Sequence, residues 1–319
     1  SKLINKNSSM AEIRPTLYSS ELQKQLFPDN SFYKKSIGET GVADKTELVE
    51  KPVQTNISKA KEGKPSSLPL TIETSTDSKK SYPTTLLYCQ PLLIDSQSEL
   101  MVNYNKRQTK QMQQASELNT KAAAYVLEHW CPTKSENILK TTGDGRTSNI
   151  VGLSSNRKAV TKGDLLKVYN LMIRMNVSGL GGRWYGMVTA DMYTDLLEIP
   201  EFVDYYKTGN ESKLKEGIVG RILGVDIFTR STDEGHAGIL YNGSKPLSGD
   251  AEVKDTLLSG ALFWNDKLVC RAEGRVNTKI NEGAPGYLGG TIIETWCRFG
   301  ADIIRDDQKG VIALLEDKA

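Results

Sequence analysis

The region 39–82 constrains this chain more than any other, because it is extended and has no cover of its own. It contains two segments of strand character, 48–57 and 68–74, joined by a turn-forming stretch rich in lysine, glycine and serine. Apolar side chains alternate with other residues in the second segment, which gives it one apolar face and predicts a two-stranded ribbon. An isolated hairpin is marginal in water, so we expect another subunit to cover this face. The residues predicted to lie in contacts between copies are Leu48, Val53, Leu70 and Ile72.

The first 38 residues hold few large apolar side chains, spaced singly among serine, asparagine and lysine. Such a segment can lie across a surface but cannot build a core, so we expect an arm. Lysines at the ribbon tip, Lys59, Lys61 and Lys64, make that tip positive. Three interpretations stay open: a solvated edge that discourages wrong strand pairing, a contact with nucleic acid, and a contact with acidic groups of a sister subunit.

A long helix is expected after the ribbon. Ser96 followed three residues later by Glu99 fits a capping box, and Cys131-Pro132 ends the pattern after Trp130. A helix of this length is a rod of about 50 Å. Its two ends are apolar and its middle, 105–114, is polar, which is typical of a rod that bridges two packed regions.

The second half of the chain mixes helices with short strands and shows no regular alternation of the two. This arrangement favours the α+β class. Residues 179–182 form a glycine cluster that lies after a helix and before a strand, the reverse of the order that a phosphate loop needs, so a turn is predicted. We expect helices over 163–175, 190–197 and 265–273, and strands over 184–188, 217–230, 291–299 and 301–304.

Composition excludes several classes of protein. The 319 residues carry 41 Lys plus Arg and 39 Asp plus Glu, a net charge of +2, which disfavours a polyelectrolyte that binds nucleic acid through surplus charge. The four cysteines are widely separated and there are two histidines, so we expect no metal site. No apolar run is long enough to cross a membrane, and the polar first ten residues predict no signal peptide. We therefore expect a protein of a reducing cytoplasm.

Candidate catalytic groups are sparse. His129 and His236 have no evident partner for acid–base chemistry. Asp302, Asp306 and Asp307 could form a carboxylate cluster, but a hairpin turn between two strands is the favoured interpretation. No catalytic site and no cofactor are predicted.

The order of parts resembles that of the major capsid protein of tailed bacteriophages, the Hong Kong 97 fold. Four segments are similar to hydrophobic patterns of that family, and the order in which they occur is the strongest part of the resemblance. They are GMVTADMYTDLLEIPEF (186–202), GIVGRILGVDIFTRS (217–231), LFWNDKLVCRAE (262–273) and the C-terminal stretch 289–315.

This resemblance implies an α+β Hong Kong 97-type fold with six parts. They are an N-terminal arm (1–38), an extended β-hairpin or E-loop (39–82), a peripheral domain with the spine helix (83–135), an apical domain (136–270), return strands of the peripheral domain (271–299) and C-terminal strands of the apical domain (300–319).

The function implied by the resemblance is structural. Copies of the chain would form hexamers and pentamers of an icosahedral shell around double-stranded DNA, which they contact non-specifically. Portal, decoration and scaffolding proteins would be the other partners, with no membrane, and the protein would be found in the virion after assembly in the host bacterial cytoplasm. Two alternatives stay open: an encapsulin-like nanocompartment, and a cytosolic enzyme that uses His129 or the carboxylates Asp302 to Asp307.

Some members of the family join their subunits covalently, from a lysine of the E-loop to an asparagine of the peripheral domain, assisted by a glutamate. The resemblance implies Lys61 for the amine, with Lys59 and Lys64 as alternatives, Asn281 or Asn277 for the amide, and Glu282 for the assisting carboxylate.

Overall fold

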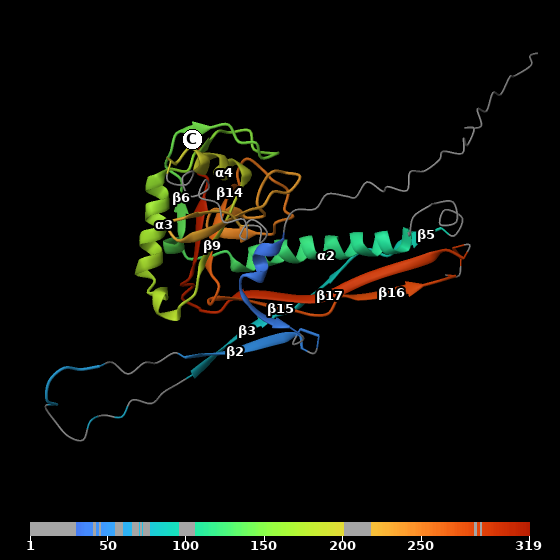
Figure 1. Ribbon diagram of the computed structural model, residues 1–319, viewed down its shortest axis with the longest axis horizontal. Coiled ribbons are helices and arrows are strands. Elements are labelled where there is room, and N and C mark those ends of the chain that lie inside the picture. The colour runs from blue at the N-terminus through green and yellow to red at the C-terminus, as the bar shows by residue number, and fades with distance from the viewer. Residues whose placement is uncertain are drawn as a thin grey trace, which may run out of the picture.

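The computed structural model describes residues 30–40, 43–44, 46–54, 60–65, 70, 72, 77–95, 106–200, 218–283, 286–287 and 289–319. These residues form a body with helices on one side, a long helix that runs along a second sheet away from the body, and a ribbon that leaves in the other direction (Figure 1). The architecture is α+β, as the sequence predicts.

The body is built on an eight-stranded sheet, called here the body sheet. Its central strands alternate between two apolar faces: in β18, Ile312 and Leu314 face one side, and Val311, Ala313 and Leu315 face the other. The pairing order is β10 (Ile218–Ile222), β11 (Val225–Thr229), β9 (Trp184–Val188), β14 (Leu258–Asn265), β12 (Leu240–Asn242) and β13 (Lys245–Leu247), with β18 (Val311–Leu315) on β14 and β6 (Ile138–Lys140) on β18.

Helices α3 (Lys162–Arg174) and α4 (Ala190–Leu197) cover one face of the body sheet. α4 begins where the sequence predicts, and α3 begins at Lys162, one residue before the expected start. The Thr161 side chain and Asp164 form a reciprocal capping box at the start of α3, and the Thr189 hydroxyl accepts a hydrogen bond from the Met192 amide at the start of α4. The other face packs against the C-terminal half of the long helix and against the segment that includes Phe32.

The second sheet, called the long sheet, is organised around β17 (Thr291–Ile303). Alternate residues of β17 are buried against the long helix, from Thr291 to Phe299. β4 (Thr85–Tyr88) and β5 (Leu92–Ile94) pair with one edge of β17, and β15 (Val269–Glu273) and β16 (Asn277–Asn281) pair with the other, while β1 (Ile37–Thr40) pairs in parallel with β15.

The long helix α2 (Lys106–Trp130) runs along the long sheet and ends in the body (Figure 1). It ends at Trp130, as predicted; the expected start at Ser96 lies outside the described residues. The indole Nε1 of Trp130 donates a hydrogen bond to the Cys270 carbonyl over 3.1 Å, and its ring packs against that of Trp264. The end of the helix is thus fixed where the two sheets meet.

Four expected elements differ from the structure. The single strand predicted over 217–230 is an antiparallel pair, β10 and β11, with Ile222 opposite Val225. The helix predicted over 265–273 is wrong: Asn265 starts a turn in which its side chain accepts the Lys267 amide, and Val269–Glu273 is strand β15. A local N-cap signal is overridden by pairing with two distant strands, β1 and β17. The strands predicted over 291–299 and 301–304 are one continuous strand, β17.

The turn at Asp306 and Asp307 is confirmed, with the Gln308 amide donating to the Arg305 carbonyl. It does not form a hairpin, however, because β17 before it and β18 after it belong to different sheets. The turn carries the chain from the long sheet to the body sheet.

A buried ion cluster fastens residues 141–160 to the body. Arg146 of β7 (Gly145–Arg146) forms a bidentate pair with Asp195 of α4 and a hydrogen bond of 2.6 Å with Glu316. Asp191 lies 3.5 Å from the same guanidinium. The side chains of the three acids are 7%, 0% and 4% exposed, in that order. Burial raises the pKa of Glu316, which the Arg146 charge partly offsets.

Candidate assembly surfaces

A two-stranded ribbon extends from the body, away from the far end of α2 (Figure 1). β2 (Leu48–Gln54) confirms the first extended segment of the sequence. Its partner is β3 (Asp77–Pro83), with Leu48 opposite Pro83 and Gln54 opposite Asp77. The second strand expected from sequence, 68–74, lies outside the described residues except for its positions 70 and 72. The strand pair β2–β3 extends beyond the two sheets, as is required of a ribbon that overlaps another copy of the chain.

The base of the ribbon is fixed by burial and by ion pairs. Val49 and Tyr82 are buried with Ala272 in a small apolar cluster, and the Tyr82 hydroxyl donates to Glu39 over 3.0 Å. Lys80 of β3 lies 2.8 Å from Asp306 and 3.7 Å from Asp302. Burial raises the pKa of Asp302, and the Lys80 charge acts against that rise. These contacts set the direction in which the ribbon leaves the body.

The four side chains predicted to contact other copies are not packed into the core of their own chain. Leu48 is 49%, Leu70 60% and Ile72 91% exposed, and Val53 is partly buried. Large apolar side chains that are this exposed on a projecting ribbon are typical of an interaction surface. Their contact with another copy stays a prediction.

The residues named for a covalent bond lie on separate surfaces. Lys61 is exposed within 60–65, at the outer part of the ribbon. Asn281 ends β16 and is exposed, and Glu282 beside it forms an ion pair with Arg107 of α2. β16 and the ribbon point in opposite directions (Figure 1), so one chain does not bring Lys61 to Asn281. A bond between them would have to join two copies.

A short segment that the sequence assigns to the arm is anchored in the core. It contains η1 (Ser31–Lys34), in which Phe32 and Tyr33 are buried. Trp264 donates a hydrogen bond to the Lys35 carbonyl over 2.9 Å, and Arg271 donates to the carbonyls of Tyr33, Lys34 and Ser36. Asn30 accepts from Arg230 and donates to Thr120 of α2. Side chains from β14, β15, α2 and the residue after β11 supply these bonds, and no local sequence signal indicates them.

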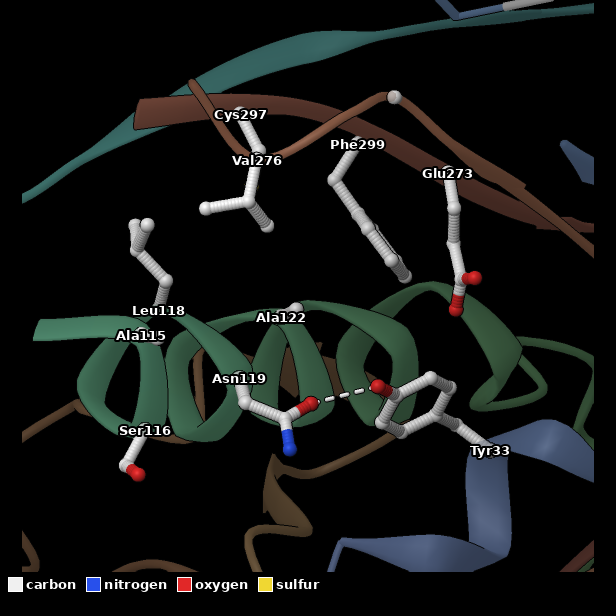
Figure 2. A pocket seen from close by; sticks show the side chains of 11 residues that line it. Tyr33, Ala115, Ser116, Leu118, Asn119, Ala122, Glu273, Val276, Cys297 and Phe299 are labelled. Atoms are coloured by element: carbon white, nitrogen blue, oxygen red, sulfur yellow. Dashed lines mark hydrogen bonds between the residues drawn. The ribbon is translucent and has the colours of Figure 1, made fainter. Parts of the chain in front are cut away.

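A groove of about 370 Å³ lies between α2 and the long sheet (Figure 2). The Tyr33 hydroxyl donates to Asn119 of α2 at one side of it, and Phe299 of β17 points into it. Burial, and then the Glu273 charge, raises the pKa of Tyr33 to about 12; burial raises that of Cys297 to about 11. Neither group is therefore activated for proton transfer or nucleophilic attack near neutral pH. The lining residues are Tyr33, Ala115, Ser116, Leu118, Asn119, Ala122, Glu273, Gly274, Val276, Cys297 and Phe299.

The candidate catalytic groups have structural contacts. The His129 ring stacks on Tyr125 with centroids 3.9 Å apart, and its Nδ1 lies 2.9 Å from the Tyr125 carbonyl. His236 is buried, which lowers its pKa, and its Nδ1 accepts the Gly238 amide. Asp307 pairs with Arg305 at 2.7 Å. In the described residues, no three histidine, cysteine or acidic side chains gather where they could hold a metal ion.

Comparison with known proteins identifies the fold. No family model matches the chain, and no curated protein matches it at a significant level.

Within the part of the chain that the structure describes, no helix has the length and apolar character to cross a membrane.

Solved structures do match over almost the whole length. The capsid structure of the cyanophage P-SCSP1u is 15% identical, covers 95% of this chain and 93% of its own, and has a TM-score of 0.63. The capsid of Ralstonia phage GP4 is 11% identical, with 100% and 98% covered and a TM-score of 0.63. A protein of Mycobacterium phage Che8 is 13% identical, with 96% and 98% covered and a TM-score of 0.59. The chain therefore has the fold of bacteriophage capsid proteins.

Proposed function

We propose that this chain is the major capsid subunit of a tailed bacteriophage, which assembles as hexamers and pentamers into an icosahedral shell around double-stranded DNA. The observation that carries the proposal is the shared fold over nearly the full length of several phage capsid structures. Its role is structural rather than enzymatic. The projecting ribbon with exposed Leu70 and Ile72 supports this function, because such side chains gain burial only when copies overlap.

The parts of the chain take the roles implied by the Hong Kong 97 fold. In this proposal 1–38 is the arm, 39–82 the E-loop, 83–135 the peripheral domain with α2 as spine helix, and 136–270 the apical domain. Segments 271–299 and 300–319 return to the peripheral and apical domains. The length of α2, the ribbon β2–β3 and the body sheet support this division.

Other partners follow from the same proposal. A shell needs a portal, and decoration and scaffolding proteins are further candidates. DNA would be contacted through scattered charge rather than through a basic patch, because the net charge is only +2. The place of action would be the virion, after assembly in the host bacterial cytoplasm.

The decisive experiment is size-exclusion chromatography of the expressed protein followed by negative-stain electron microscopy. Shells, tubes or hexamers are expected; a stable monomer of 35.3 kDa would refute the proposal. Particles isolated with their contents separate the two kinds of shell, since double-stranded DNA indicates a phage capsid and enclosed protein indicates an encapsulin-like compartment.

The covalent bond has its own test. If Lys61 is joined to Asn281 of another copy, wild-type particles boiled in detergent run as multimers, whereas Lys61→Arg particles run as monomers. Lys64→Arg, in the same exposed stretch, is the matched control. Monomers from wild-type particles would rule the bond out and leave the shell proposal untouched.

A further inference from the structure

An exposed apolar stripe runs along α3, beside the face of the helix that packs on the body sheet. Leu166, Tyr169 and Ile173 occupy positions i, i+3 and i+7 and are 42%, 39% and 53% exposed. Lys162 and Arg174 are exposed at the two ends of the stripe, and Lys167, also exposed, pairs with Asp164 over 3.0 Å. The one acid of the helix, Asp164, is fully buried in its capping box. The surface is therefore apolar with a basic border, and it is called here the α3 stripe.

A second surface has the opposite charge. Asp233 and Glu234 are exposed at the tip of the loop that follows β11. Val151, which is 63% exposed, lies directly on this tip, because its amide donates to the Glu234 carbonyl over 2.8 Å. His236 is 1% exposed and its Nε2 lies 3.3 Å from the Glu234 carboxylate; burial lowers the pKa of His236, so the imidazole adds no positive charge to this surface at neutral pH. This surface is called the acidic tip.

The two surfaces lie on opposite sides of the body sheet. α3 packs on the face that includes Ile227 and Phe263. The loop of the acidic tip is anchored on the other face, where Ala237 is buried beside α2 residues and Arg230 reaches Asn30. In Figure 1, α3 likewise forms one outer edge of the body. One chain therefore cannot join its own stripe to its own tip, whereas two neighbouring copies can.

We propose that the α3 stripe of one copy docks on the acidic tip of the next copy. Contacts between two different surfaces are heterologous, and repeated around an axis they generate a closed ring. Opposite charges at the border select this register, and burial of the apolar residues supplies the attraction. The inference rests on the proposed shell function and names the chemistry of a side-by-side contact within it.

Charge reversal tests the contact. One variant carries Lys162→Glu and Arg174→Glu, and a second carries Asp233→Lys and Glu234→Lys. Each alone places like charges together, so the protein concentration at which half of the chains assemble rises about tenfold or more. An equimolar mixture of the two variants restores six-membered rings, in which the variants can alternate, and a single chain with all four changes restores closed shells. Lys134→Glu with Lys245→Glu is the matched control at two exposed lysines elsewhere, and it assembles like wild type.

The readouts are sedimentation velocity and electron microscopy, with thermal unfolding to show that each variant folds. Ile173→Ser provides an uncharged test: it impairs assembly more than Met112→Ser, an equally exposed apolar position on α2 that is 58% exposed. Folded single variants that assemble like wild type, or a folded chain with all four changes that fails to assemble, refute this contact alone. Wild-type protein that stays monomeric refutes the shell function and the contact together.

Discussion

Removal of the Arg146 guanidinium tests the energetics of the body. In Arg146→Ala, the carboxylates of Asp195, Glu316 and Asp191 lose their shared cation while all three stay at most 7% exposed. Breaking a buried ion pair from one side costs about 3–5 kcal/mol, because the remaining charge is neither paired nor hydrated. We therefore expect a loss of about that size in the free energy of unfolding at pH 7.

Urea unfolding of the soluble subunit, followed by tryptophan fluorescence, measures this loss. Trp264 and Trp130 are both buried in the core, so their emission reports loss of the body. Arg305→Ala is the matched control: it also removes a guanidinium from a carboxylate, that of Asp307, but the two side chains are 43% and 32% exposed. Such surface pairs contribute about 0–1 kcal/mol.

The same cluster predicts how the effect depends on pH. Burial raises the pKa of Glu316 in the folded chain, so this group takes up a proton at a higher pH than an ordinary glutamate does. The cost of Arg146→Ala should then shrink between pH 7 and pH 4.5. A cost at pH 7 no larger than that of Arg305→Ala, or a cost that grows as the pH falls, would refute the argument.

Three further predictions follow. Gly260→Ala should lower stability by about 1–3 kcal/mol, because its Cβ would collide with the Leu314 carbonyl and lie 2.8 Å from the Leu315 Cα, whereas Gly179→Ala, with open space around it, should change the melting temperature little. Leu70→Ser with Ile72→Ser should reduce the fraction of chains in particles without lowering the melting temperature of the subunit, since both side chains are exposed; an equal loss of both would contradict an assembly role. A group with a raised folded pKa stabilises below its unfolded pKa and loses that contribution as the pH rises through the folded pKa. Glu316→Gln should therefore remove part of the decline in stability between about pH 4.5 and neutral pH, and an unchanged pH profile would contradict the raised pKa.

Sequence reasoning predicts those elements whose signals are local. The cap at Thr189 and the stop after Trp130 lie next to the residues they control, so α4 and the end of α2 follow from short windows. The expected start of α3 at Gly163 is one residue late, because the cap is Thr161. β15 shows the limit of this approach. Asn265-Asp266 has the composition of a helix start, but the segment after it is a strand because β1 and β17 pair with it from far along the chain.

The assembly surfaces show a similar division. Exposure of Leu70 and Ile72 could be anticipated, because no nearby segment could cover an apolar face of the ribbon. The exposure of the α3 stripe could not be anticipated, because the sequence shows the same helical spacing of apolar residues whether they face the core or lie beside it. Leu166 and Leu165 are neighbours in sequence, yet the first is 42% and the second 5% exposed. Only the direction in which the helix packs on the sheet separates them.

The pairing of α2 with β17 has a mechanical consequence. The two elements run together from the body toward the same far end, as the members of a truss do (Figure 1). A helix of 25 residues, about 37 Å long, resists compression along its axis, and an extended strand has almost no slack to give under tension. A load that bends the far end toward the helix side compresses α2 and stretches β17, which are the deformations that each element resists. The bending force is then transmitted to the end of α2 in the body, where Trp130 is hydrogen-bonded to the Cys270 carbonyl of β15 and its ring packs against Trp264. The stiffness of a thin wall built from such subunits would depend on the contacts of Trp130 more than on the middle of α2 and β17.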